Sequence, residues 1–194
     1  MSFMAIVEVI GVLTGIWAVY LLYRNQILTW PIGFISIFCF LFLFWKLKLY
    51  GDFTVQIMFL LTGIWGWIHW KQSSLKLPTK LTTQLLIIWI VITLASIPFT
   101  TILLKSYFVD CSYPIAEATI LSLSIVGQIL TTQRKLENWY WWIIADLLMI
   151  IVYLKKEIYL TTAYAAIILV IGIFGLRSWK EMCNQSVNEI KFKS

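Results

Sequence analysis

The chain has 194 residues, of which 61% are hydrophobic and only 12% are charged, and its formal net charge is +6. Soluble domains have about 45–50% apolar and about 25% charged residues, so this composition excludes a soluble globular fold and predicts an all-α, multi-pass membrane protein. The positive charge does not indicate nucleic-acid binding, because the basic residues lie in short segments between apolar runs, where they determine membrane topology.

Seven apolar segments are long enough to span a membrane, which takes about 17–25 residues. In chain order they cover residues 3–23, 30–45, 52–70, 81–104, 112–130, 137–154 and 158–179. Pro31 and Pro114 stand at the starts of two segments, where a missing N–H costs nothing, and Pro98 predicts a kink in the fourth. Six spans are the alternative if the first segment lies in the membrane interface. The polar segment 180–194 is expected to be frayed.

An internal repeat emerges when residues 1–71 are aligned without gaps on residues 110–180, at an offset of 109. Fourteen aligned positions are identical, and the six that are Ile or Leu carry little weight in so apolar a chain. The other eight pairs are Glu8/Glu117, Trp30/Trp139, Lys46/Lys155, Tyr50/Tyr159, Gly63/Gly172, Gly66/Gly175, Trp70/Trp179 and Lys71/Lys180. This pattern predicts a tandem repeat of three helices.

The repeat predicts a 3+1+3 architecture. Three spans invert the chain, so the fourth span is needed as a linker if the two repeats are to run parallel in the membrane. Residues 1–71 then form the first repeat, 72–109 a basic linker and linker helix, 110–180 the second repeat, and 181–194 a polar cytoplasmic tail. Ten Lys and Arg residues lie on the side of the C-terminus and five on the other, which predicts a cytoplasmic C-terminus and an external N-terminus.

The candidate binding residues concentrate in the sixth span. On a helix, Trp139, Trp142, Asp146 and Tyr153 make one stripe, which combines two indole rings with a carboxyl group inside an apolar segment. An ionisable residue inside a span is a functional candidate by default, and indole faces attract cations. At the repeat offset, the partners of Trp142 and Asp146 are Gly and Ile, so this equipment belongs to the second repeat alone.

Polar residues on two further spans are predicted to complete the site, with structural alternatives left open. Glu117 and Gln128 share one face of the fifth span, and Gln56 lies on the third. An equally good explanation of Gln56 is that it forms a hydrogen bond between helices. Glu117, whose repeat partner is also acidic, could likewise form a hydrogen bond that holds the bundle together. For Trp139, the interfacial aromatic belt is as good an explanation as binding.

No catalytic or metal-binding pattern is present in the sequence. Cys39, Cys111 and Cys183 are scattered without CxxC spacing, and the single histidine, His69, lies near a helix end. There is neither a glycine-rich phosphate loop nor an HExxH motif. The sequence therefore predicts a protein that is not an enzyme and that uses no metal or cofactor.

Several motifs resemble the PnuC family of vitamin transporters over nearly the whole chain. They are Trp30-Pro-Ile-Gly33, Leu49-Tyr-Gly-Asp52, Gln56, Gly66-Trp-Ile-His-Trp70, Pro114, Glu117, Glu137-Asn-Trp-Tyr-Trp-Trp142, Asp146, Tyr153, Lys156, Tyr159 and Trp179-Lys180. The resemblance implies a seven-helix, SWEET-like fold with parallel repeats. It implies that the WxxW residues Trp139 and Trp142, which follow Asn138, contact the aromatic part of the solute.

The resemblance also implies facilitated diffusion of a vitamin across the bacterial inner membrane, trapping of the vitamin by a cytoplasmic kinase, and a homotrimer. Members of the family carry nicotinamide riboside, thiamine, riboflavin or deoxynucleosides. The first two contain a positively charged aromatic ring, which suits tryptophan faces and a carboxylate, so we expect one of them as the substrate. Two alternatives stay open: a proton-coupled carrier of a neutral vitamin or deoxynucleoside, and a membrane receptor or assembly subunit that transports nothing.

Overall fold

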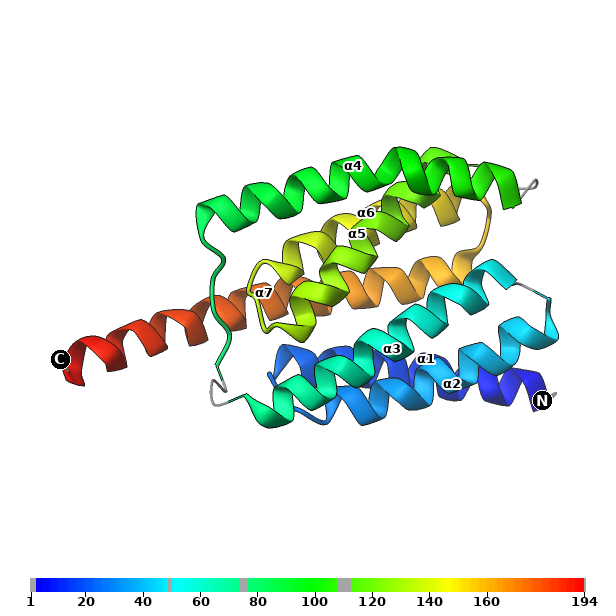
Figure 1. Ribbon diagram of the computed structural model, residues 1–194. Helices are drawn as coiled ribbons and strands as arrows, with labels where there is room; N and C mark the ends of the chain where they lie inside the picture. Colours follow the sequence, from blue (N-terminus) through cyan, green and yellow to red (C-terminus); the bar gives the residue numbers. More distant parts are fainter. Residues whose placement is uncertain (1–2, 49, 74–76, 108–112, 194) are drawn as a thin grey trace. The chain divides into compact units, whose positions relative to one another are not determined.

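The computed structural model describes residues 3–48, 50–73, 77–107 and 113–193, and within these ranges the chain forms seven α-helices (Figure 1). They are α1 (Phe3–Tyr23), α2 (Thr29–Lys46), α3 (Tyr50–Gln72), α4 (Thr83–Tyr107), α5 (Pro114–Thr132), α6 (Asn138–Lys155) and α7 (Tyr159–Lys193). The predicted all-α class and the order of its helices are confirmed. Cys111 lies outside the described residues.

The C-terminal end of α7 differs from the prediction. The sequence predicts a helix that ends near Trp179 and a frayed tail, whereas α7 continues without a break to Lys193. This prediction is wrong because a polar sequence marks where a helix leaves the membrane and not where the helix ends. No proline or glycine follows Gly175, so the sequence contains no residue that interrupts the helix there.

Five of the seven described helices are long and apolar enough to cross a membrane. These candidate spans are Phe3–Tyr23, Thr29–Lys46, Thr83–Ser106, Pro114–Thr132 and Tyr159–Gln185. The helices α3 and α6 do not qualify, because polar side chains and tryptophans lower their hydropathy. With 18 residues α6 is nevertheless about 27 Å long, close to the ~30 Å hydrocarbon core. Length and composition thus identify two spans fewer than predicted.

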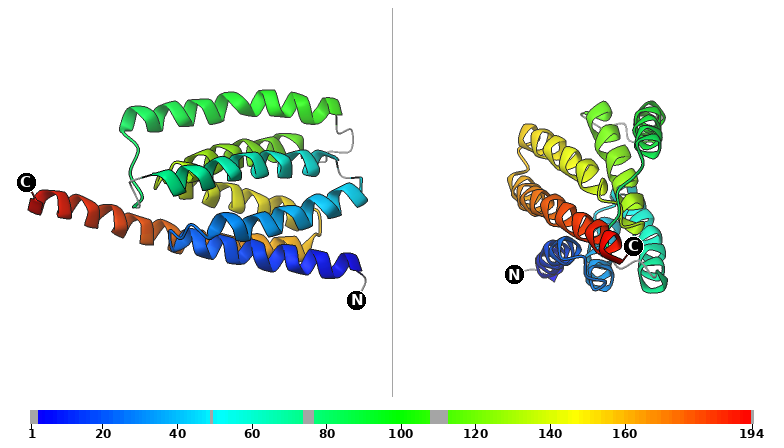
Figure 2. Two further views of the ribbon diagram at one scale, coloured as in Figure 1. Left: turned by 60° about the horizontal axis from the view of Figure 1, so that its bottom comes forward. Right: turned by 90° about the vertical axis from the view of Figure 1, so that its left-hand side faces the viewer.

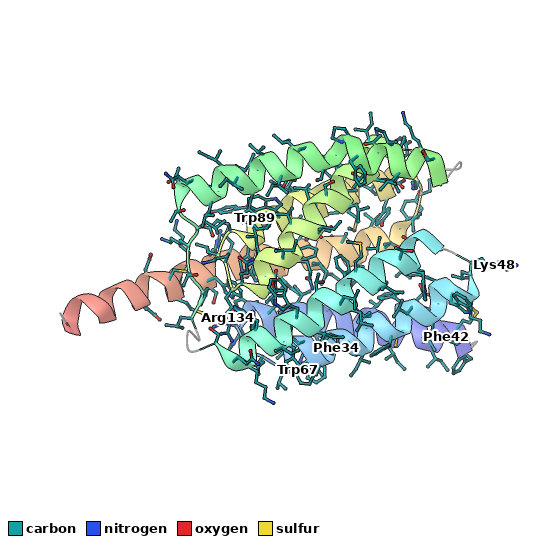
Figure 3. All side chains as sticks on the ribbon, in the orientation of Figure 1. Phe34, Phe42, Lys48, Trp67, Trp89 and Arg134 are labelled. Atoms are coloured by element: carbon teal, nitrogen blue, oxygen red, sulfur yellow. The ribbon has the colours of Figure 1, made fainter. Side chains whose placement is uncertain are left out.

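Residues 1–76 form one compact unit, in which α2 packs against both α1 and α3. Thr29 and Ser36 of α2 each donate a hydrogen bond to a backbone carbonyl of α1, at 2.8 and 2.7 Å. On the side of α3 the contacts are aromatic. The rings of Phe34 and Trp67 meet edge-on with their centroids 6.0 Å apart (Figure 3). Hydroxyl groups therefore join α2 to one neighbour and aromatic rings join it to the other.

Residues 77–194 form the second compact unit, in which the helices pack in the order α4, α5, α6, α7 (Figure 2). The core between α5 and α6 consists of Leu123, Val126, Leu130, Trp141 and Ala145. Trp89 of α4 packs against this core (Figure 3), and Nε1 of Trp141 donates to Oγ1 of Thr93 at 2.8 Å. The fourth helix therefore packs against α5 and α6, in the same compact unit as α7.

The two sets of three helices share several bounds and loop conformations at an offset of 109, each set within its own unit. Both ends of α2 and α6 differ by this offset, as do the end of α1 and the end of α5. The loop residues with positive φ match in the same way: Asn25 (53°) with Arg134 (51°), and Lys48 (58°) with Glu157 (59°). These loop residues differ in type, so the matching loop conformations do not depend on identical side chains.

The segment that leads into α4 is attached to the α5–α6 loop. The N–H of Thr79 donates to the carbonyl of Arg134 at 3.0 Å, and the N–H of Leu136 donates to the carbonyl of Thr79 at 2.9 Å. Oε2 of Glu137 accepts the N–H of Leu81 at 3.0 Å. Burial in this loop lowers the pKa of the Arg134 guanidinium below its ordinary value. Thr79 and Leu81 are thus bonded to the second unit through the α5–α6 loop and the start of α6.

The close approach of α6 and α7 generates a stability prediction. A Cβ at Gly175 would lie 2.5 Å from the indole ring of Trp139, whereas a Cβ at Gly172 would meet no atom closer than 3.5 Å. Gly175→Ala is expected to lower the free energy of unfolding by about 1–3 kcal/mol through overpacking, and Gly172→Ala to change it little. Thermal unfolding in detergent measures both variants, and equal stability would contradict this packing.

Candidate functional site

Trp139 packs α6 against α7. Its ring meets that of Trp179 edge-on with the centroids 5.6 Å apart, lies over the two glycines of α7, and is only 1% exposed. Trp30 makes the same contact with Trp70 in the first unit, at 5.5 Å. A ring contact that occurs in both units is a packing contact between helices. The structure therefore gives Trp139 a packing role that neither sequence interpretation, interfacial belt or binding, had considered.

Trp142 lies on another side of α6, against α5. Its Nε1 donates to Oγ1 of Thr131 at 3.1 Å, and its ring lies so close to Gly127 that a Cβ there would be 3.2 Å from the indole. Unlike Trp139, Trp142 is only partly buried. Part of its surface is therefore available for a contact with a solute.

Asp146 and Tyr153 lie on the same side of α6 as Trp142. Trp141 belongs to the core against α5, and Trp139 packs against α7. At 3.6 residues per turn, Trp142, Asp146 and Tyr153 fall between these two packing faces. We call these three residues the α6 strip.

Asp146 is the buried acid of the α6 strip. It is 5% exposed, and its Oδ2 has no hydrogen-bond partner within the part of the chain that the structure describes. Tyr164 of α7 lies near enough to interact with it electrostatically. Burying a carboxylate oxygen in apolar surroundings is costly unless it is paired. This carboxyl group is therefore suited to a cationic or hydrogen-bonding partner from outside the chain.

The predicted residues of α5 have different surroundings. Glu117, at the start of α5, forms an ion pair with Lys156, which caps the end of α6, and both side chains are 27% exposed. Gln128 is partly buried about three turns further along the helix, directly after Gly127, on which Trp142 packs. Glu117 thus has a partner in the chain, and Gln128 directly follows a residue of α5 that Trp142 contacts.

Asn138 lies one turn before Trp142 on α6, and Gln56 belongs to the other compact unit. Asn138 is fully buried at the start of α6, where its Nδ2 donates to the carbonyl of Lys135 at 2.5 Å and closes the α5–α6 turn. Gln56 is partly buried on α3, in the first unit. One compact unit therefore holds the α6 strip and Gln128, while Gln56 belongs to the other.

Three residues near the α6 strip were missed by sequence reasoning: Gly127, Thr131 and Tyr164. Each is a residue type that is common in membrane helices, and no spacing marks it as a partner of Trp142 or Asp146. For metal binding, no group of three or more His, Cys, Asp or Glu side chains within the described ranges is arranged to hold an ion.

Residues 5–181 match the model of a protein family that is described as "nicotinamide mononucleotide transporter". The chain belongs to this family. Membership makes it one of a group of transporters, and its apolar helices agree with a multi-pass protein of the bacterial inner membrane. The resemblance to PnuC proteins that the sequence motifs indicated is confirmed.

Individual relatives match most of the chain. The nicotinamide riboside transporter PnuC of Escherichia coli (strain K12) is 21% identical over 201 residues, which are 89% of this chain and 84% of the relative. That of Neisseria mucosa is 23% identical over 149 residues, 73% of this chain and 57% of the relative. A crystal structure of the vitamin B3 transporter PnuC superposes with a TM-score of 0.77 at 17% identity, covering 92% of this chain and 82% of that one, and shows the shared fold.

The Glu117–Lys156 ion pair generates a prediction about stability. Because both side chains are partly exposed, a double-mutant cycle with Glu117→Gln and Lys156→Met is expected to give a coupling below about 1 kcal/mol that decreases with added salt. Lys155→Met is the matched control, since Lys155 lies over the ring of Tyr113 instead and its effect should add to that of Glu117→Gln. Thermal unfolding measures the cycle, and coupling to Lys155 but not to Lys156 would contradict the pairing.

Proposed function

We propose that this protein imports a cationic aromatic B vitamin, thiamine or nicotinamide riboside, by facilitated diffusion. Its transporter family supports transport, and its relatives in Escherichia coli and Neisseria mucosa are described as nicotinamide riboside transporters. One observation favours a cation. The carboxyl group of Asp146 is buried with its Oδ2 unpaired among the described residues, on the same strip of α6 as the partly accessible ring of Trp142.

The charge of the vitamin ring complements both residues. A cationic ring over the face of Trp142 gains about 0.5–2 kcal/mol of cation–π attraction. The same charge near Asp146 compensates the carboxylate, which is otherwise costly in an apolar environment. Riboflavin and deoxynucleosides are neutral, so they would leave the carboxylate without a counter-charge. A cation is therefore the better partner for these two side chains together.

The predicted site residues divide into two roles in this proposal. Trp142 and Asp146 contact the vitamin ring, and Tyr153, Gln128 and Gln56 supply polar contacts to the rest of the solute. The other three predicted residues act indirectly: Trp139 packs α6 against α7, Asn138 closes the α5–α6 turn, and Glu117 pairs with Lys156.

Transport in this proposal uses a 3+1+3 arrangement with the boundaries predicted from the sequence. The matching bounds and loop conformations of the two three-helix sets support a repeat, and rocking of one repeat against the other would alternate access. The ten-to-five bias of basic residues supports a cytoplasmic C-terminus and an external N-terminus. A cytoplasmic kinase that phosphorylates the vitamin would trap it, and a homotrimer follows from the family resemblance alone.

Binding to the purified protein is the direct test of the site. Thiamine, nicotinamide riboside, riboflavin and a deoxynucleoside are titrated separately while intrinsic tryptophan fluorescence is recorded. One of the two cationic vitamins is expected to quench saturably. Asp146→Asn is expected to weaken its binding by about tenfold or more, since hydrogen bonds to charged groups contribute about 1.5–3 kcal/mol. Trp142→Ala is expected to weaken it by about two- to thirtyfold, which corresponds to the loss of the cation–π attraction.

Glu157→Gln is the matched control for this titration, because Glu157 is an exposed acid beyond the end of α6. It should bind the vitamin as the wild type does. Saturable binding of a neutral ligand alone would contradict the charge argument. Unchanged binding in both Asp146→Asn and Trp142→Ala would refute the assigned site.

The transport mode is tested in sealed vesicles that contain the purified protein. Facilitated diffusion predicts that the vitamin equilibrates at the same rate with and without a proton gradient, and accumulates only when a vitamin kinase and ATP are enclosed. Accumulation that an uncoupler abolishes would instead support a proton-coupled carrier. A complete lack of saturable uptake, in protein that binds no vitamin, would support a receptor or assembly subunit.

A further inference from the structure

Two neighbours on α5, Thr131 and Gly127, contact the indole of Trp142. The hydroxyl of Thr131 accepts the indole N–H at 3.1 Å and itself donates to the carbonyl of Gly127 at 2.8 Å. The missing side chain of Gly127 leaves room for the ring, because a Cβ there would lie 3.2 Å from Cε2 and 3.3 Å from Nε1 of Trp142. One hydrogen bond and one close contact therefore restrict the orientation of the indole plane.

This arrangement is confined to the second repeat. At an offset of 109, the counterparts of Gly127, Thr131 and Trp142 are Ala18, Leu22 and Gly33. At these three positions the first unit consequently has no indole, no hydroxyl group to accept a hydrogen bond, and an alanine in place of Gly127. The Trp139–Trp179 contact, by contrast, has its equivalent in Trp30–Trp70. Packing of the repeat is thus achieved in the first unit without any Trp142-like group.

The adjacent residue shows what a purely structural bond of this kind looks like. Nε1 of Trp141 donates to Oγ1 of Thr93 at 2.8 Å, and the tryptophan is 5% exposed in the core between α4, α5 and α6. A buried indole N–H needs such a partner, because leaving it unpaired costs free energy. Trp142 is only partly buried, so its indole N–H has less need of a hydrogen-bond partner within the protein. The bond to Thr131 therefore chiefly restricts the orientation of the ring.

We propose that Thr131, supported by Gly127, is a positioning residue for substrate recognition: it holds the Trp142 indole in the orientation that receives the vitamin ring. This inference rests on the proposed binding role of Trp142. Attraction between a ring and a cation depends on the cation lying over the ring face, so a rotated indole loses affinity without any loss of substrate contacts from Thr131 itself.

Two substitutions at Thr131 separate positioning from general stability. Thr131→Val keeps the shape of the side chain and removes the acceptor, and we expect it to weaken vitamin binding by about two- to tenfold, the range for loss of one neutral hydrogen bond. Thr131→Ser keeps the hydroxyl and should bind within about twofold of the wild type. Thr93→Val is the matched control, since it removes the equivalent bond of Trp141 and should lower thermal stability while leaving affinity unchanged.

A spectroscopic readout identifies the bond directly. In protein with 15N-labelled tryptophan, the indole N–H signal of Trp142 is assigned by its loss in Trp142→Phe. Thr131→Val is expected to shift that signal, and Thr93→Val to shift only the signal of Trp141. Gly127→Ala should shift the signals of both tryptophans, because its Cβ would also lie 3.3 Å from Cβ of Trp141.

The outcomes distinguish this inference from the proposed function. If Trp142→Ala loses vitamin binding but Thr131→Val binds like the wild type, or if Thr131→Ser is as impaired as Thr131→Val, the positioning role is overturned while the site stands. If Trp142→Ala itself binds normally, the proposed site is wrong and the inference fails with it. Weakened binding in Thr131→Val with recovery in Thr131→Ser, at equal thermal stability, is the supporting result.

Discussion

The charge of a carboxylate inside an apolar helix bundle must be compensated, and this constraint applies to Asp146. In lipid there is no water to solvate a charged group, so intramembrane acids pair with another residue, face an aqueous path or meet a ligand. Glu117 forms an ion pair with Lys156, whereas Oδ2 of Asp146 has no hydrogen-bond partner among the described residues. This difference makes Asp146 the better candidate for a contact with a cationic solute.

The tryptophans of α6 divide between stability and recognition according to what they contact. Trp139 meets Trp179 and the glycines of α7, and Trp141 belongs to the core with α5 and α4. Only Trp142 of these three is partly exposed, and it is anchored by a hydroxyl on α5. Packing on both sides of α6 makes the helix a rigid support, which limits how far the α6 strip can move relative to its neighbours.

Much of the fold was predictable from the sequence, because local signals mark most of its elements. Apolar runs separated by basic loops gave the helix order, and Pro114 marked the start of α5. The end of α7 was not predictable in this way, because polarity indicates where a helix leaves the membrane and not where its hydrogen bonds stop. The attachment of Thr79 to the α5–α6 loop depends on residues distant in sequence, which no local pattern reveals.

The candidate site was predictable as a set of residues but not as an arrangement. Trp139 and Trp142 are three residues apart, so a helical pattern puts them on one stripe and cannot separate their roles. The neighbouring helices distinguish the two roles: the ring of Trp139 packs on Gly175 of α7, and the indole N–H of Trp142 donates a hydrogen bond to Thr131 of α5. Asp146 was predictable from its own residue type and position, because acidic residues are rare inside membrane spans.

The most direct test of the account is a cycle that couples the charge of the ligand to the charge of Asp146. Affinity is measured for the cationic vitamin and for its uncharged counterpart, the reduced form of nicotinamide riboside or the deaza analogue of thiamine, with wild type and with Asp146→Asn. We expect the wild type to prefer the cation and Asp146→Asn to reduce this preference by about tenfold or more, a coupling of about 1.4 kcal/mol. An equal preference in both proteins would contradict the pairing of Asp146 with the vitamin ring.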